Sequence, residues 1–98
     1  MDEYINSVVE QIVDVVEVDK IILFSKKQDL EGKLSSFKIC VIIKKETKTE
    51  SEKEIYINVD CEIPFDVVVY TSNEWNKLVN EKGSFGNKVN RTGSVIYG

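Results

Sequence analysis

The chain has 98 residues, of which 42% are hydrophobic and 31% are charged, and its formal net charge is −4. These values are typical of one globular domain spanning residues 1–98, and the negative charge argues against strong, non-specific binding to nucleic acid or to an anionic membrane. The chain has no histidine, which excludes Ser-His and Cys-His catalysis and histidine metal sites.

Cysteine use and hydropathy indicate a cytoplasmic protein. Both cysteines, Cys40 and Cys61, lie among apolar residues, as buried free thiols commonly do. The first residues, MDEYINSVVEQ, are acidic and polar, unlike a signal peptide, and no apolar run approaches about 18 residues. We therefore expect no disulfide framework and no membrane association.

The first predicted element is an amphipathic helix that begins after Asp2. Its apolar residues recur with the i, i+3, i+4, i+7 spacing of a helix face, at Ile5, Val8, Val9, Ile12, Val13 and Val16. Two strands follow at residues 20–24 (KIILF) and 37–43 (FKICVII). Continuous β-branched runs of this kind favour strands that are covered on both faces.

The middle of the chain is less clear. Residues 44–54 form a mixed-sign charge run, which is typical of a solvated loop or helix face. Residues 55–59 (IYINV) fit either a strand, because Ile55, Ile57 and Val59 alternate, or a helix, because Ile55 and Val59 lie one turn apart.

The clearest strand covers residues 65–71 (FDVVVYT), directly after Pro64. Thr71 and Glu74 then form a capping box that opens a helix with an apolar stripe of Trp75, Leu78 and Val79. A weaker helix at 85–91 and a short strand at 94–97 complete the chain. The order α-β-β-(α or β)-β-α-α-β predicts an α/β (α+β) domain with a small mixed sheet.

Three short stretches carry a resemblance to a known family. IILF runs into Ser25-Lys26, Ser36-Phe37-Lys38 opens the next strand, and Asp66 lies in PFDVVVYT. This arrangement resembles the minimal nucleotidyltransferase domain of the DNA polymerase beta-like superfamily, in which the corresponding motifs are a Gly-Ser turn, an Asp-x-Asp and a third carboxylate. The later SNEW, GSF and GSVIYG also resemble small members, so the resemblance covers nearly the whole chain.

The resemblance implies a nucleotidyltransferase-like fold with a degenerate site. In the family, three carboxylates hold two divalent cations that activate the attacking oxygen and stabilise the leaving pyrophosphate. Here Ser36 and Lys38 supply a hydroxyl and an ammonium, while Ser25 and Lys26 replace the phosphate-binding turn. At about 4 Å and an effective dielectric of about 20, Coulomb's law gives roughly 8 kcal/mol of repulsion between an ammonium and a divalent cation. Asp66 is the one metal ligand that remains.

We therefore expect a pseudoenzyme that needs no cofactor and acts as a binding or regulatory module. It would be similar to the family's antitoxins, which pair with an all-helical HEPN ribonuclease. Ordinary structural roles are open for both key residues: Lys38 could be a strand-edge lysine with its charge in water, and Asp66 a cap or salt-bridge partner.

Three other functions remain open. An active enzyme would use Mg²⁺ and a nucleoside triphosphate, with Asp66 joined by Asp29, Glu31 or a partner's carboxylates. A metal-independent binder would hold a nucleotide or another anion with Lys26, Lys27 and Lys38. The third possibility is a chain that folds but has no activity of its own. The sequence does not indicate an oligomeric state.

Overall fold

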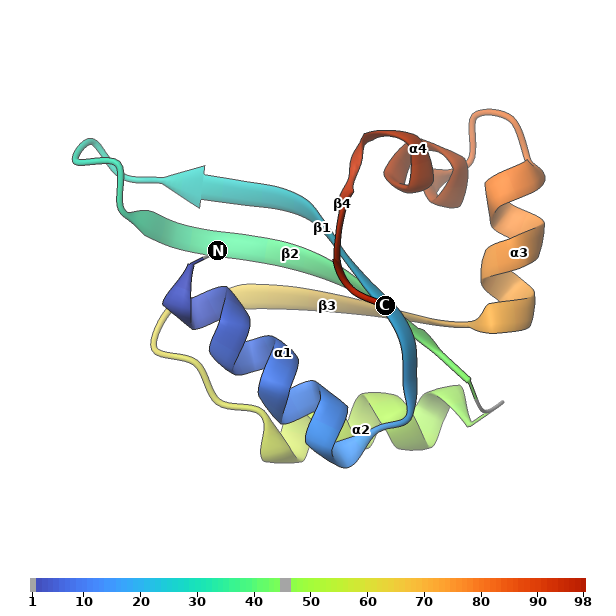
Figure 1. The fold of residues 1–98 in the computed structure, drawn as a ribbon, viewed down its shortest axis with the longest axis horizontal. Helices are drawn as coiled ribbons and strands as arrows, with labels where there is room; N and C mark the ends of the chain where they lie inside the picture. Colours follow the sequence, from blue (N-terminus) through green and yellow to red (C-terminus); the bar gives the residue numbers. More distant parts are fainter. Residues whose placement is uncertain (1, 45–46) are drawn as a thin grey trace.

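In residues 2–44 and 47–98, which the computed structural model describes, eight elements follow in the order α-β-β-α-β-α-α-β (Figure 1). They are α1 (Glu3–Val15), β1 (Val18–Gln28), β2 (Leu34–Ile43), α2 (Lys48–Asn58), β3 (Phe65–Thr71), α3 (Ser72–Asn80), α4 (Phe85–Thr92) and β4 (Ser94–Tyr97). This order confirms the predicted α+β fold class.

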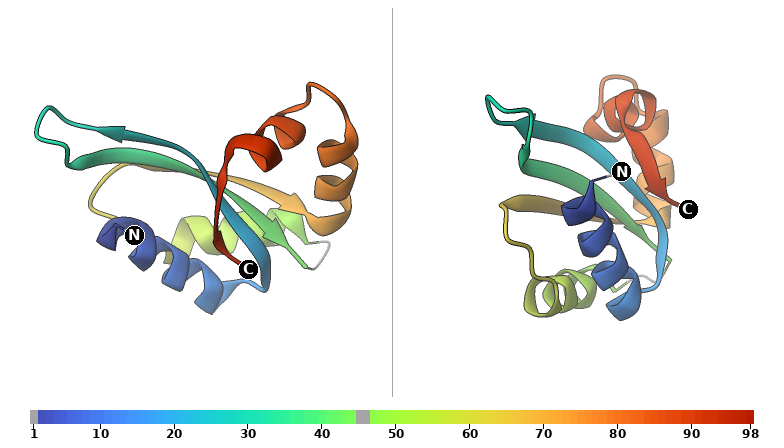
Figure 2. Two further views of the ribbon diagram at one scale, coloured as in Figure 1. Left: turned by 45° about the horizontal axis from the view of Figure 1, so that its top comes forward. Right: turned by 60° about the vertical axis from the view of Figure 1, so that its left-hand side comes forward.

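The four described strands form one mixed sheet in the order β3-β2-β1-β4. β1 pairs antiparallel with β2 and with β4, whereas β2 pairs parallel with β3. The β1–β2 hairpin turns at residues 29–33, where the Asp29 carboxylate accepts hydrogen bonds from the backbone N–H groups of Glu31 and Lys33 at 2.9 Å each. Its tip projects beyond the helices at one end of the molecule (Figure 2). β1 and β2 are therefore the interior strands, and β3 and β4 form the two edges of the sheet.

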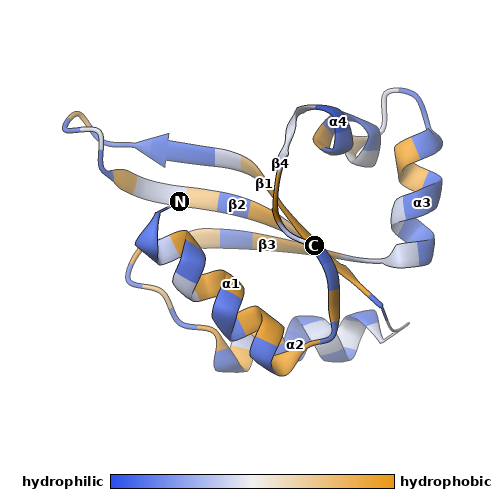
Figure 3. Cartoon of the chain, in the orientation of Figure 1, coloured by the Kyte–Doolittle hydropathy of each residue, from blue (hydrophilic) through white to orange (hydrophobic). Residues whose placement is uncertain are grey.

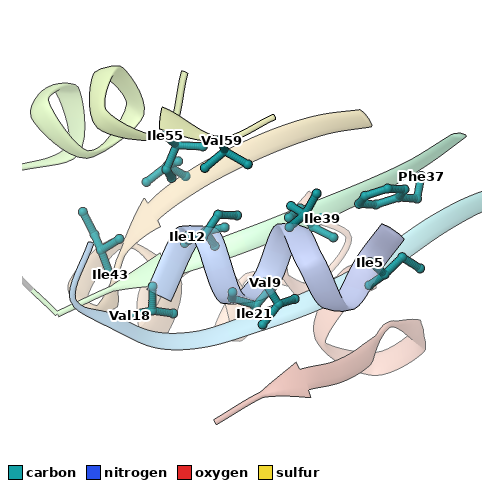
Figure 4. Packing of buried hydrophobic residues seen from close by; sticks show 13 residues of the cluster. Ile5, Val9, Ile12, Val18, Ile21, Phe37, Ile39, Ile43, Ile55 and Val59 are labelled. Atoms are coloured by element: carbon teal, nitrogen blue, oxygen red, sulfur yellow. The ribbon is translucent and has the colours of Figure 1, made fainter. Parts of the chain in front are cut away.

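Helices α1 and α2 cover one face of the sheet and enclose the larger core. The Asp2 carboxylate caps α1 by accepting hydrogen bonds from the N–H groups of Tyr4 (2.7 Å) and Ile5 (3.4 Å). Figure 4 shows Ile5, Val9 and Ile12 of α1 lying over the sheet, as their helical spacing predicts. The buried residues that pack with them are Val8, Val18, Ile21, Phe37, Ile39, Val41, Ile43, Ile55, Val59 and Val69.

Helices α3 and α4 cover part of the opposite face. The predicted capping box is present, because the Thr71 hydroxyl accepts a hydrogen bond from the Glu74 N–H while the Glu74 carboxylate accepts one from the Thr71 N–H, both at 3.1 Å. A smaller buried cluster joins the two helices to the sheet: Ile22, Cys40, Ile42, Trp75 and Val89. Both helices lie toward one end of the sheet, so the β1–β2 arm at the other end is left uncovered on this face (Figures 1 and 2).

Two elements differ from the sequence expectation. The strand predicted to end at Phe24 continues to Gln28, so Ser25 and Lys26 lie inside β1 instead of in a turn. Pairing with β2 extends this strand through polar residues that carry no apolar pattern. Most of the ambiguous IYINV stretch is helical, because Ile55 and Val59 both turn into the core. The charge run supplies the first turns of α2, and its Lys45 and Glu46 lie outside the described residues.

Two further expectations concern cysteines and membranes. Cys40 is buried, Cys61 is half-buried, and both are free thiols. None of the helices in the described part of the chain has the length and apolarity that a membrane crossing requires.

The buried face of α1 allows a direct test of stability. Ile12 is fully buried, so Ile12→Ala should lower the free energy of unfolding by about 2–5 kcal/mol, measured by urea denaturation. Leu30, which is 107% exposed at the hairpin tip, is the matched control, and Leu30→Ala should change it by less than about 0.5 kcal/mol. Equal effects of the two substitutions would contradict the packing described here.

Candidate functional site

Three of the five residues singled out by the family resemblance lie in one row across the sheet. Lys38 on β2 is the register partner of Asp66 on β3 and, on its other side, of Ser25 on β1. Register partners on neighbouring strands point to the same face of a sheet. Lys38 and Asp66 are exposed and Ser25 is half-buried. The fold therefore brings these three side chains together on the face that α1 and α2 do not cover.

Ser36 lies beside this row. It precedes Lys38 by two residues on β2, so its side chain points to the same face. Its register partner is Lys27 on β1, whereas β3 begins only at Phe65, opposite Phe37. Ser36 is therefore near Lys38 but one step beyond the end of the strand that carries Asp66.

Lys26 is not part of the same cluster. Its register partner is Phe37, whose ring is buried on the α1 face, and Lys26 lines a hollow there with Tyr4 and Ile5 of α1. Strand alternation from Ile22 would have placed Lys26 on the Lys38 face. The register shift between Leu23 and Ser25 inserts one residue and reverses that alternation. The sequence-based pairing of Lys26 with Lys38 is therefore wrong, and of these two neighbouring lysines it is Lys27 that shares the face of Lys38.

The covered end of this face begins directly beyond the row. Phe24 of β1 makes an edge-to-face contact with Phe85 of α4, with 5.2 Å between the ring centroids. Cys40, the next residue of β2 on this face, is buried beneath the helices. Burial raises the pKa of the Cys40 thiol to about 12, so the thiol stays neutral and unreactive near neutral pH. The chemistry of the row is thus limited to its exposed polar groups.

These polar groups do not suit a divalent metal ion. The positions that supply carboxylates in the family offer one carboxylate, one ammonium and one hydroxyl, whereas Mg²⁺ prefers several oxygen ligands and repels an ammonium. Over residues 2–44 and 47–98, no three histidine, cysteine, aspartate or glutamate side chains gather closely enough to hold a metal. Asp29 and Glu31 lie in the exposed hairpin turn, and the Asp29 carboxylate is already engaged by backbone N–H groups.

A groove beside β3 is a second surface feature, which the sequence analysis did not identify. Its cavity of about 630 Å³ lies between α2 and β3 and is lined by Lys48, Glu52, Ile55, Tyr56, Val59 and residues 65–70. At one end, the Lys48 ammonium lies 5.2 Å from the centroid of the Tyr70 ring and 3.9 Å from the Glu74 carboxylate. The hydrogen bond from the Thr71 N–H and the charge of Lys48 hold the pKa of Glu74 below its usual value, while burial raises the pKa of Tyr70.

The spacing of the α2 residues would have pointed to this groove. Lys48, Glu52, Tyr56 and Val59 recur at intervals of three or four residues, which places them on one helix face. This signal could be used only once residues 55–58 were known to be helical.

Comparison with known proteins adds no family assignment. No protein-family model, no curated protein and no solved structure matches the chain significantly. The class that the fold defines is a small mixed α+β domain. Its nucleotidyltransferase character remains a hypothesis that depends on the sequence resemblance.

The Lys38–Asp66 register makes a testable electrostatic prediction. Lys38→Asp and Asp66→Lys each place like charges side by side and should destabilise the protein, whereas the double substitution restores opposite charges. Because each single substitution turns an attraction into a repulsion, the charge-swapped protein should be more stable than the two single effects predict, by about four times the 0.2–1 kcal/mol of one cross-strand pair. Urea denaturation of the four proteins measures this coupling. Strict additivity would show that Lys38 and Asp66 are not neighbours.

Proposed function

We propose that this protein is a nucleotidyltransferase-like domain whose metal site has been replaced, and that it acts as a non-catalytic binding or regulatory module. The observation that carries the proposal is the row formed by Asp66, Lys38 and Ser25. From the family resemblance, acidic metal ligands are expected at the start of β2, beside Asp66 of β3. This chain has Lys38 at that position. The protein thus keeps the scaffold and one carboxylate but lacks the ligand set for nucleotidyl transfer.

The proposed role is to bind another protein. By analogy with the family's antitoxins, the partner would be a helical protein of the HEPN type, which this domain would inhibit by contact and without modifying it. This part depends on analogy alone, since a fold can serve many functions. Under this proposal the domain needs neither Mg²⁺ nor a nucleoside triphosphate, and it works in the cytoplasm.

A second candidate is a metal-independent anion binder. Lys27 and Lys38 lie on the same uncovered face, beside the hydroxyl-bearing residues Ser25 and Ser36. Ammonium groups bind phosphate as point charges, and hydroxyl groups can donate hydrogen bonds to phosphate oxygens. The Asp66 carboxylate on the same face opposes an anion, which makes this candidate the weaker one.

Incubation with labelled nucleoside triphosphates and Mg²⁺ or Mn²⁺ tests the proposal. We expect no transfer of label to protein or RNA, because the site lacks the acidic ligands that hold the metal ions. Transfer that is abolished by Asp66→Ala would overturn the proposal in favour of an active enzyme. A rise in melting temperature with ATP in the absence of metal, lost in Lys38→Ala, would instead favour the anion binder.

The double variant Ser36→Asp/Lys38→Asp is the positive control. It rebuilds an Asp-x-Asp beside Asp66, and three carboxylates should bind Mn²⁺ more tightly than one. Mn²⁺ should therefore raise the melting temperature of this variant and leave that of the natural sequence unchanged. An equal rise in both proteins would show that the natural residues already hold the metal.

A further inference from the structure

The outer edge of β3 is an unprotected strand edge. β3 lies at the end of the sheet order β3-β2-β1-β4, so one of its edges is free of strand pairing in the described structure. Proteins usually protect such edges with lysines, prolines, bulges or very short strands. β3 contains no lysine, proline or bulge, and Asp66 is its one charged residue: its seven residues, FDVVVYT, pair with β2 without a register shift. The opposite edge strand, β4, has only four residues.

The groove described above runs along this free edge. It is lined by six consecutive residues of β3, from Phe65 to Tyr70. Because side chains alternate between the two faces of a strand, six consecutive residues can line one cavity only where it opens at the strand edge. α2 forms the wall of the groove, and the large side chain that it adds there, Tyr56, is 88% exposed.

We propose that this edge binds the β3 edge of a second copy of the chain, in an antiparallel pair that makes one continuous eight-stranded sheet. An extended strand at this edge would satisfy the free N–H and C=O groups of β3, as in other cases of strand addition. The β3 strand of a second copy can occupy this position, because a two-fold axis through Val68 brings the two β3 strands side by side in antiparallel order. That register pairs all seven residues and places Val67 opposite Val69 of the other copy.

The charges of the edge agree with this register. Asp66, the one charged residue of β3, faces Tyr70 of the other copy, and the Lys48 ammonium lies over that Tyr70 ring. Each carboxylate therefore meets a hydroxyl and a positive charge, and the two-fold axis repeats the contact. A register in which Asp66 faced its own copy would place two carboxylates opposite each other, which is destabilising.

The same axis also accounts for the exposed Tyr56 side chain of α2. A two-fold axis perpendicular to the sheet leaves both α2 helices on the same face, one on each side of the strand pair. Tyr56, which lines the groove, would then lie along the seam between the two copies and be covered there. Large apolar side chains that are exposed on a single chain but covered in an assembly are typical of interfaces.

Sedimentation velocity over a range of protein concentrations tests the dimer. We expect a monomer–dimer equilibrium, and Tyr56→Glu should raise the dissociation constant by about tenfold or more, as for a residue near the centre of an interface. Leu30→Glu is the matched control, since Leu30 is also a large exposed apolar residue but lies at the hairpin tip. The proposal fails if the natural chain stays monomeric at every concentration, or if both variants weaken the dimer equally.

Cysteine cross-linking tests the register. In a Cys61→Ser background, Val68→Cys places two thiols on the two-fold axis, within reach of a disulfide, whereas Val67→Cys leaves them two residues apart along the strands. Mild oxidation should cross-link the Val68→Cys protein and leave the Val67→Cys protein mainly uncross-linked. A dimer that cross-links equally well through both positions would rule out this register.

Discussion

The central strand β2 constrains the rest of the structure. It hydrogen-bonds with β1 on one side and with β3 on the other, and the five residues from Ile39 to Ile43 are all buried. α1 and α2 pack on one of its faces and α3 and α4 on the other. Because side chains alternate along a strand, a slip of β2 by one residue would reverse the face of every residue it carries. The two cores, and the polar residues at the start of the strand, thus depend on the same register.

This register explains why the candidate site lies where it does. The helices α3 and α4 cover the end of the sheet that holds Cys40 and Ile42. The outer half of β1, which these helices leave uncovered, is hydrophilic (Figure 3). Lys38 and Asp66 lie side by side there because β2 and β3 run parallel and pair from Phe37 and Phe65 onward. Asp66 also belongs to the free edge of β3, so the proposed site and the proposed dimer interface share one carboxylate.

Much of the fold could be predicted from local patterns. The helical spacing in α1, the capping box of α3 and the β-branched runs of β2 and β3 each reflect an interaction that is close in sequence, and the structure confirms them. The bulge after Leu23 could not be predicted, because it depends on how β1 pairs with β2. Because of that single inserted residue, Lys26 lies on the α1 face, and Lys27 lies on the face of Lys38. The groove beside β3 could not be predicted for a related reason. It forms only because residues 48–58 are helical and because β3 lies at the edge of the sheet, and neither fact follows from a local pattern.

Measuring nuclear Overhauser effects between β2 and β3 in solution is the most direct test of this account. We expect contacts between the backbone protons of Lys38 and Asp66, and between those of Phe37 and Phe65, as the parallel register requires. A pattern shifted by one residue, with Phe37 opposite Asp66, would place the aspartate on the α1 face. That result would contradict both the candidate site and the function proposed from it.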